Sequence, residues 1–296
     1  MSMTPISSKP NCLHKNLRQI NLSIPVKETI IRSLTGIALI ALIVLSLVIH
    51  PVGYLLLFGI ACILSWIEFA KMYKGDIQPV VRTTVAIYLS ASFLLAFFVA
   101  SDTLLSQWLL IPVTILLFLP LAFRLIIPSV KMYRIWLITL ATIYLLTGFS
   151  SLHFIAYPGG SEGYSPKWIL FTFYFLWIYD SMAYVSGRLA GKHPVWPSVS
   201  PGKTWEGSIG GALFTIGLAI LFSHYFPYIS TWEWVGFAGI IIAFGSLGDF
   251  FESWLKRKAG VKDSGRILPG HGGVLDRLDS LLLSVPFITL YLYIIL

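Results

Sequence analysis

The chain has 296 residues, of which 56% are hydrophobic and only 11% are charged. Soluble domains carry about 25% charged residues, so this composition excludes an ordinary soluble protein and indicates an integral membrane protein. The net charge of +8 does not indicate a nucleic-acid partner, because the basic residues fall in short gaps between apolar runs. The two cysteines, Cys12 and Cys62, predict neither a disulfide framework nor a metal site.

The apolar runs predict an all-α, polytopic membrane protein. They are long and continuous, whereas a membrane barrel needs alternating strands of about ten residues. A helix of about 20 apolar residues crosses a bilayer. The first 25 residues are polar without a signal-peptide pattern, and residues 26–35 read as a short amphipathic interfacial helix. Nine apolar runs follow, near residues 36–50, 52–70, 84–101, 104–123, 133–156, 167–187, 205–226, 232–250 and 276–296.

The basic residues predict the orientation of these nine helices. With the N-terminus inside, 20 of the 21 Lys and Arg residues lie on one side of the membrane, and only Lys167 lies outside. Cytoplasmic loops of membrane proteins carry an excess of Lys and Arg. We therefore expect a multi-pass protein of the cell (inner) membrane, with a cytoplasmic N-terminus and the C-terminus outside.

Polar residues divide the chain into three parts. Residues 1–35 form a polar and amphipathic cytoplasmic segment, and residues 36–165 form transmembrane helices with few charges. From residue 166 onward, polar residues cluster at every helix end that faces inside. Ionisable groups within a membrane are costly and usually functional. We therefore expect residues 166–296 to form the catalytic domain and residues 36–165 to serve as a scaffold.

Four carboxylates are predicted at one membrane depth. Asp180 and Asp249 end the sixth and eighth runs, and Asp276 and Asp279 begin the ninth. The last two share one helical face, because they are spaced i and i+3. Such oxygen ligands suit a hard cation such as Mg²⁺, which often brings substrate phosphates with it. The alternative is that each acid pairs with a neighbouring Lys or Arg at the interface.

The loop from Gly187 to Gly207 complements these acids. Its basic side chains supply positive charge, and its hydroxyls and glycines allow a phosphate to approach the backbone closely. Gly202-Lys203-Thr204 resembles the end of a P-loop, but that motif needs a glycine where Pro197 stands, so we exclude a Walker site. Ser200-Pro201 and Glu206 also suit the start of the seventh helix, and both roles are compatible.

His271-Gly272-Gly273 precedes the ninth helix. The two glycines are expected to leave backbone N–H groups accessible, and a helix N-terminus beside Arg277 is a natural anion site. A lone loop histidine is more often an ordinary polar residue, yet His271 here is a candidate phosphate contact or proton donor. Together these features predict a membrane-embedded, metal-dependent site for phosphate chemistry at the inner face, with a lipid as one substrate.

Two motifs resemble those of the phosphatidate cytidylyltransferases, also called CDP-diglyceride synthases. The first runs from Ser253 to Asp279 as S-x-L-K-R, K-D-x-G and L-P-x-H-G-G-V-x-D-R-L-D. The second runs from Asp180 through Gly187-Arg188 to S-P-G-K-T-x-E-G, which ends at Gly207. The resemblance implies that CTP and phosphatidic acid form CDP-diacylglycerol and pyrophosphate. It also implies Mg²⁺ with a monovalent cation such as K⁺, and a homodimer. Residues 36–165 are expected to serve as scaffold and in the dimer.

The resemblance also implies roles for individual residues. The expected catalytic residues are Asp249, Asp276, Asp279, His271 and Arg277, and the expected metal ligands are Asp249, Asp276, Asp279 and Asp180. The expected substrate-binding residues are Asp180, Arg188, Ser200, Lys203, Thr204, Glu206, Lys256, Arg257, Lys262, Asp263, Gly272 and Gly273.

Two other functions compete with this one. A polyprenol kinase also uses CTP, but it transfers the γ-phosphate to an alcohol and releases CDP instead of pyrophosphate. An ion-coupled transporter would use the acids to bind cations in transit, but such sites lie near the middle of the membrane, whereas these acids are predicted at helix ends. The motif of the CDP-alcohol phosphotransferases is absent from the sequence.

Overall fold

The computed structural model describes residues 26–73, 77–101, 132–158 and 163–296. These residues form eight helical segments: α1 (Val26–Ile49), α2 (Pro51–Met72), α3 (Pro79–Ser101), α5 (Met132–Ala156), α6 (Lys167–Ala190), α7 (Trp205–Tyr225), the continuous segment of α8 (Thr231–Ile240) and α9 (Ser246–Lys258), and α10 (Leu275–Ile295). Within the described residues, all of these except α1 are long and apolar enough to cross a membrane. The protein is thus an all-α polytopic membrane protein, as expected.

Two expected helix boundaries differ from those of the structure. Residues 26–35 do not form a separate interfacial helix but the first turns of α1, because no proline separates them from the apolar run that begins at Gly36. The eighth run was expected to end near residue 250, yet α9 continues to Lys258 and the chain turns only at Gly260, where φ is +71°. A left-handed glycine after the last turn is a common helix stop. The fourth expected run, 104–123, and the N-terminal tail lie outside the described residues.

A small β-hairpin interrupts the all-α pattern between α6 and α7. Strands β1 (Pro194–Trp196) and β2 (Ser200–Thr204) pair antiparallel, with Pro194 opposite Thr204 and Trp196 opposite Ser200. Thr204 also caps α7, because its Oγ1 accepts a hydrogen bond of 3.2 Å from the N–H of Gly207. The hairpin therefore leads directly into α7, and the residues of β2 are held at its N-terminus.

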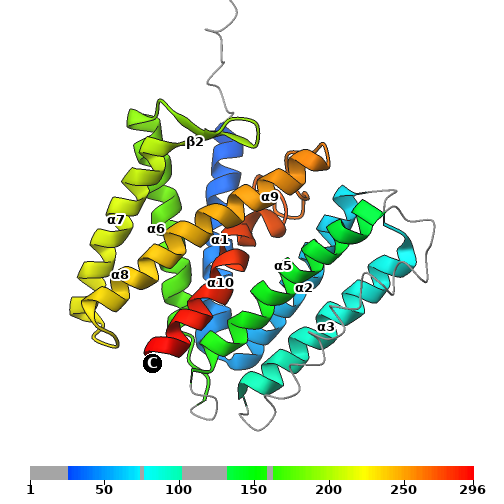
Figure 1. Cartoon of the computed structure of the whole chain (residues 1–296), viewed down its shortest axis with the longest axis horizontal. Helices are drawn as coiled ribbons and strands as arrows, with labels where there is room; N and C mark the ends of the chain where they lie inside the picture. Colours follow the sequence, from blue (N-terminus) through cyan, green and yellow to red (C-terminus); the bar gives the residue numbers. More distant parts are fainter. Residues whose placement is uncertain (1–25, 74–76, 102–131, 159–162) are drawn as a thin grey trace, which may run out of the picture.

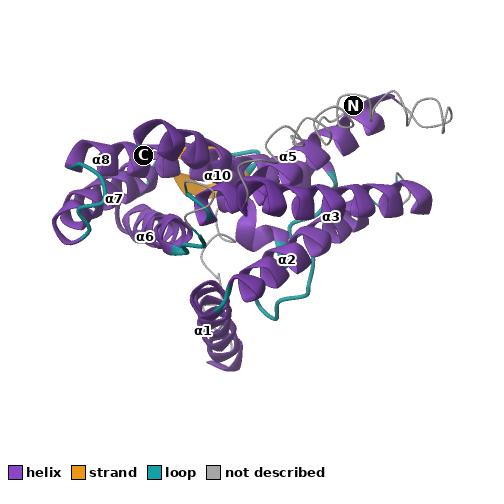
Figure 2. Ribbon diagram, turned by 90° about the horizontal axis from the view of Figure 1, so that it is seen from below, coloured by secondary structure: helices purple, strands orange, loops and turns teal. Residues whose placement is uncertain are grey.

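The helices form two groups with α10 between them. In Figure 1, α2, α3 and α5 lie together on one side and α6, α7 and α8 on the other. The view from below shows the same division (Figure 2). Since α10 contacts α5 of one group and α6 and α8 of the other, the last helix of the chain joins the two groups.

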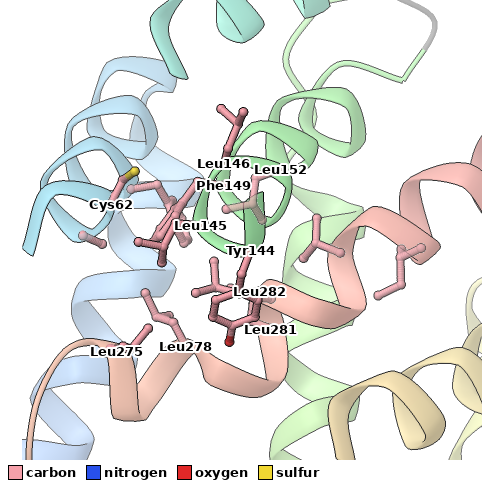
Figure 3. Close-up of a cluster of buried hydrophobic side chains, with 14 of the residues drawn as sticks. Cys62, Tyr144, Leu145, Leu146, Phe149, Leu152, Leu275, Leu278, Leu281 and Leu282 are labelled. Carbon is pink, nitrogen blue, oxygen red and sulfur yellow. The ribbon is translucent and has the colours of Figure 1, made fainter. Parts of the chain in front are cut away.

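Leucines on one face of α10 form its contact with α5. Leu278, Leu281 and Leu282 of α10 lie against Tyr144 and Phe149 of α5 (Figure 3). All five side chains are at most 6% exposed. Burial of this apolar face fixes the rotation of α10 about its axis.

The approach of α5 to α10 depends on Gly148. A Cβ at this position would lie 2.7 Å from the carbonyl oxygen and 2.9 Å from the Cα of Leu282. Gly148→Ala should therefore lower stability by about 1–3 kcal/mol, because the clash is with backbone. Thermal unfolding in detergent would measure this loss. The matched control is Gly217→Ala in α7, where a Cβ meets nothing within 4 Å; equal melting temperatures for the two variants would contradict this packing.

Candidate active site

A cavity of about 380 Å³ lies where α1, α6, α9 and α10 meet. We call it the acidic cavity. Its charged and polar lining consists of Asp180, Asp249, Lys256, Asp263, His271, Asp276, Arg277, Asp279 and Ser280. Its apolar lining comes mainly from α1 and α6: Gly36, Leu39, Ile40, Ile43, Phe173, Leu176 and Trp177, with Leu281 of α10. The structure thus brings the four predicted carboxylates to one cavity, and one wall of that cavity is apolar.

A second cavity of about 400 Å³ lies beside the hairpin, and we call it the hairpin cavity. Lys203 and Thr204 of β2, Arg188 of α6 and Phe250 of α9 contribute to its lining. Asp180 and Asp249 line both cavities. These two carboxylates therefore stand between the two cavities.

The sequence predicted that Asp180 and Asp249 lie at helix ends, but the structure places both residues within helices. Asp180 lies ten residues before the end of α6, and Asp249 lies within the continuous helix that runs from Thr231 to Lys258. A π-helical turn, Ile241–Gly245, interrupts this helix just before Asp249. Such insertions often occur at functional sites, because they change the direction of the side chains that follow.

Gly248 brings α9 close to α10. A Cβ at Gly248 would lie 2.4 Å from the carbonyl oxygen of Asp279 and 3.1 Å from the Cα of Ser280. Only a residue without a side chain fits this contact, since both neighbours are backbone atoms. The contact places Asp249, the next residue along α9, beside the first turns of α10.

Asp249 is paired with a lysine from the hairpin. The Nζ of Lys203 lies 2.5 Å from its Oδ2, and the Oγ of Ser253 donates a hydrogen bond of 3.3 Å to its Oδ1. The Lys203 ammonium also lies 5.0 Å from the centre of the Phe250 ring. The hairpin therefore delivers a positive charge to the wall between the two cavities.

Asp276 organises the segment that leads into α10. Its carboxylate accepts hydrogen bonds from Lys256 Nζ at 2.8 Å, from the N–H of Gly273 at 2.7 Å and from the N–H of Ser264 at 3.0 Å. Lys256 also pairs with Glu252, which is fully buried in α9. Asp276 thus already has three donors from three parts of the chain.

Glu68 of α2 is a site-supporting residue that sequence reasoning missed. Its carboxylate accepts hydrogen bonds from the N–H groups of Val274 and Leu275, at 3.0 and 2.9 Å, and from Ser264 Oγ at 3.1 Å. The available signal was an acidic residue within the apolar run 52–70.

The expectation of free amides is therefore wrong for Gly273, Val274 and Leu275. The N–H of Gly273 is bound by Asp276, and the next two N–H groups are bound by Glu68. The glycines have a different purpose: Gly272 has φ of +83°, and a Cβ on Gly273 would lie 2.4 Å from Glu68 Oε2. They allow the chain to fold tightly around two carboxylates.

His271 and Arg277 lie at the rim of the acidic cavity. The Nε of Arg277 donates a hydrogen bond of 2.9 Å to the carbonyl oxygen of His271, and its side chain is exposed. Gly36 of α1 faces the imidazole, because a Cβ there would lie 3.5 Å from His271 Nε2. Both residues can reach a substrate in this cavity.

Other predicted binding residues lie outside the linings of both cavities. Glu206, in the first turn of α7, binds the chain just before the hairpin, because it accepts hydrogen bonds from the N–H groups of Lys192 and His193 at 3.0 and 3.2 Å. Arg257 donates to the carbonyl oxygens of Val199 and Val261. The remaining members of this set are Ser200, Lys262, Gly272 and Gly273.

Within the described ranges, no three His, Cys, Asp or Glu side chains are grouped closely enough to hold a metal ion by themselves. Ammonium groups instead pair with two of the four carboxylates, Asp249 and Asp276. Mg²⁺ in phosphate-transfer sites is often held by only one or two carboxylates, with waters and substrate phosphates as the other ligands. The donor chemistry of the acidic cavity therefore fits a magnesium ion that binds together with its substrate.

Comparisons with known proteins agree with this chemistry. A model of the family described as "Cytidylyltransferase family" matches residues 30–295. Proteins named phosphatidate cytidylyltransferase from Staphylococcus epidermidis and Staphylococcus saprophyticus are 44% identical to the chain over 137 residues, and one from Staphylococcus aureus is 43% identical. Each match covers 46% of this chain and 52% of the relative. The chain thus spans about half the length of the curated relatives it matches.

Proposed function

The chain belongs to the cytidylyltransferase family, and on this basis we propose that it is a phosphatidate cytidylyltransferase. It joins CTP and phosphatidic acid into CDP-diacylglycerol and releases pyrophosphate. One observation carries the proposal: Asp180 and Asp249 lie between the acidic cavity, which has an apolar wall, and the hairpin cavity, whose lining includes Lys203, Arg188 and Thr204. A reaction between a lipid and a nucleotide needs two such environments on either side of one charged centre.

The linings support a place for each substrate. In the acidic cavity, the apolar residues of α1 and α6 receive the start of the acyl chains, while Lys256 and Arg277 attract the lipid phosphate. In the hairpin cavity, Lys203, Arg188 and the Thr204 hydroxyl bind the triphosphate. Charge-assisted hydrogen bonds from Lys and Arg to phosphate are among the stronger polar contacts in proteins.

The proposed reaction needs positioning more than acid–base catalysis. An oxygen of the lipid phosphate attacks the α-phosphorus of CTP, and the bond from that phosphorus to the oxygen bridging to the β-phosphate breaks. The electron pair leaves with pyrophosphate. Because a phosphomonoester has a second pKa of about 6, the nucleophile is already anionic at neutral pH. Phosphoryl-type transfers depend chiefly on alignment and on stabilisation of negative charge, which Lys203, Lys256 and Arg277 supply.

We propose Asp180, Asp249, Asp276 and Asp279 as the residues that hold Mg²⁺, with a monovalent cation such as K⁺ beside it. The bound ion supplies additional neutralisation of phosphate charge. The carboxylates themselves hold the lysines of the site in place, since Asp249 fixes Lys203 and Asp276 fixes Lys256.

The arrangement in the membrane is also a proposal. We propose nine helices that span the cell (inner) membrane, with the N-terminus in the cytoplasm. This arrangement would place the hairpin and the segment 259–274 at the cytoplasmic face. The distribution of Lys and Arg supports this orientation. We further propose that residues 36–165 provide a scaffold and the surface of a homodimer, and that residues 166–296 carry most of the catalytic side chains.

The decisive experiment uses the purified protein in lipid nanodiscs with phosphatidic acid, Mg²⁺ and CTP labelled in two ways. We expect label from the cytidine or the α-phosphate to become lipid-soluble, and label from the γ-phosphate to appear as pyrophosphate. Transfer of the γ-phosphate to a polyprenol with release of CDP would instead establish the kinase. Cation flux in CTP-free vesicles without lipid labelling would establish the transporter.

A further inference from the structure

We infer that Glu68 is a positioning residue, through which the group of helices α2, α3 and α5 holds the catalytic end of α10 in place. This inference rests on the proposed function, because it assigns Glu68 to the same site. Glu68 lies near the C-terminal end of α2 and only 1% of it is exposed. Its three donors, Ser264, Val274 and Leu275, all belong to the segment that leads into α10.

The carboxylate acts as an N-cap that is supplied by a different helix. The first N–H groups of a helix lack partners within the helix, and Val274, the residue before α10, has no capping side chain of its own. A buried carboxylate is costly unless it is fully hydrogen-bonded. Three donors satisfy Glu68, and negative charge at a helix N-terminus is favourable.

Two glycines make room for this carboxylate. A Cβ at Gly265 would lie 2.5 Å from Glu68 Oε1, and a Cβ at Gly273 would lie 2.4 Å from Oε2. The segment therefore wraps around Glu68 from both ends. The functional side chains Asp263, His271 and Asp276 lie just before, within and just after this segment, respectively.

Two tyrosines, one in α5 and one directly after α2, hold the site at two further backbone positions. Tyr144 Oη of α5 donates a hydrogen bond of 2.9 Å to the carbonyl oxygen of Asp279, and Tyr73 Oη donates one of 2.9 Å to that of Leu255 in α9. Glu68 completes this set by holding the start of α10. It contacts neither cavity directly, so its effect on the reaction passes through the backbone that carries Asp276 and Asp279.

The test compares Glu68→Gln with Tyr54→Phe in the full-length protein in nanodiscs. Gln keeps the size of the side chain but replaces one acceptor oxygen with an NH₂ group that faces N–H donors. Tyr54 lies in the same helix, fourteen positions or about 21 Å away, and its Oη shares a buried hydrogen bond of 2.7 Å with His153. Tyr54→Phe thus removes a buried hydrogen bond from α2 without touching the segment.

Both variants should lower the melting temperature, but only Glu68→Gln should change the site. We expect faster amide hydrogen exchange in peptides covering residues 264–276 and a fall in kcat of about 10- to 100-fold at saturating substrates and Mg²⁺, because small misplacements are costly to catalysis. Ser264→Ala removes one donor only and should show the same effects more weakly. The double variant Glu68→Gln/Ser264→Ala should then lose less than the product of the two single effects.

The outcomes are distinct. Unchanged exchange in residues 264–276, or equal losses of kcat in Glu68→Gln and Tyr54→Phe, would overturn the inference. If Glu68→Gln does not fold, the comparison of Ser264→Ala with Tyr54→Phe decides by the same two readouts. Hydrogen exchange requires no turnover, so a wild-type protein that forms no lipid-soluble cytidine product would refute the proposed function while the exchange data still test Glu68.

Discussion

Asp249→Asn should lower kcat for cytidylyl transfer by about 100- to 1,000-fold, the typical effect of removing one electrostatic group from a reaction centre. Asp249 borders both cavities and holds Lys203 of the hairpin through an ion pair. The amide keeps the shape of the side chain but loses its charge. It therefore weakens both the proposed cation site and the position of the Lys203 ammonium.

The matched control for Asp249→Asn is Glu233→Gln. Glu233 is also an acidic residue on the continuous helix from Thr231 to Lys258, but it lies at the opposite end, where its carboxylate accepts a hydrogen bond from the N–H of Ser230. The control should keep wild-type kcat. Transfer of α-phosphate label to lipid at several Mg²⁺ concentrations would measure both variants. Full turnover by Asp249→Asn in a folded protein would rule out Asp249 as a metal ligand or charge-bearing catalytic residue.

Asp276→Asn should cost both activity and stability. The carboxylate accepts from Lys256 and from the N–H groups of Ser264 and Gly273, and an amide cannot accept from all three. The Asp276 and Lys256 side chains are only 6% and 12% exposed. Removing one partner of such a pair destabilises a protein by about 3 kcal/mol or more. Thermal unfolding and lipid labelling should therefore both show large losses.

A triple variant separates these two effects. Lys256 also pairs with Glu252, which is fully buried, so Glu252→Gln and Lys256→Met are combined with Asp276→Asn to remove all three charges together. Replacement of a buried ion pair or triad by uncharged groups is often neutral for stability, so the melting temperature should recover in part. Turnover should remain low, because both a carboxylate and an ammonium group are missing from the acidic cavity. Recovery of turnover together with stability would show that Asp276 acts only on folding.

Much of the local structure was predictable, because it depends on neighbouring residues. The long apolar runs predicted membrane helices, and the ninth run, expected at 276–296, is α10 at Leu275–Ile295. Asp276 and Asp279 were expected to begin that helix, and they do. The motif residues likewise indicated the family, since their spacing in the chain is itself the signal.

Boundaries inside the polar regions were less predictable. The extension of α9 to Lys258 contains no glycine or proline and is amphipathic, but its charges had placed it outside the apolar run. The hairpin at Pro194–Thr204 arises where polar sequence with prolines and a glycine carries no strong hydrophobic period. In such segments tertiary contacts decide between helix, strand and loop. Arg257, for example, ties the hairpin to the segment after α9 through the carbonyl oxygens of Val199 and Val261.

The sequence by itself determined the membrane class, most of the helices and the family, because apolar period and motif spacing are properties of the chain alone. Only the tertiary structure decided which groups meet. It showed that Asp180 and Asp249 separate two cavities, and that Glu68, 206 positions before Val274, binds the amides that the sequence had left for phosphate. Contacts of this kind depend on how helices pack, through close approaches such as that of Gly248 to Asp279, and no local pattern encodes them.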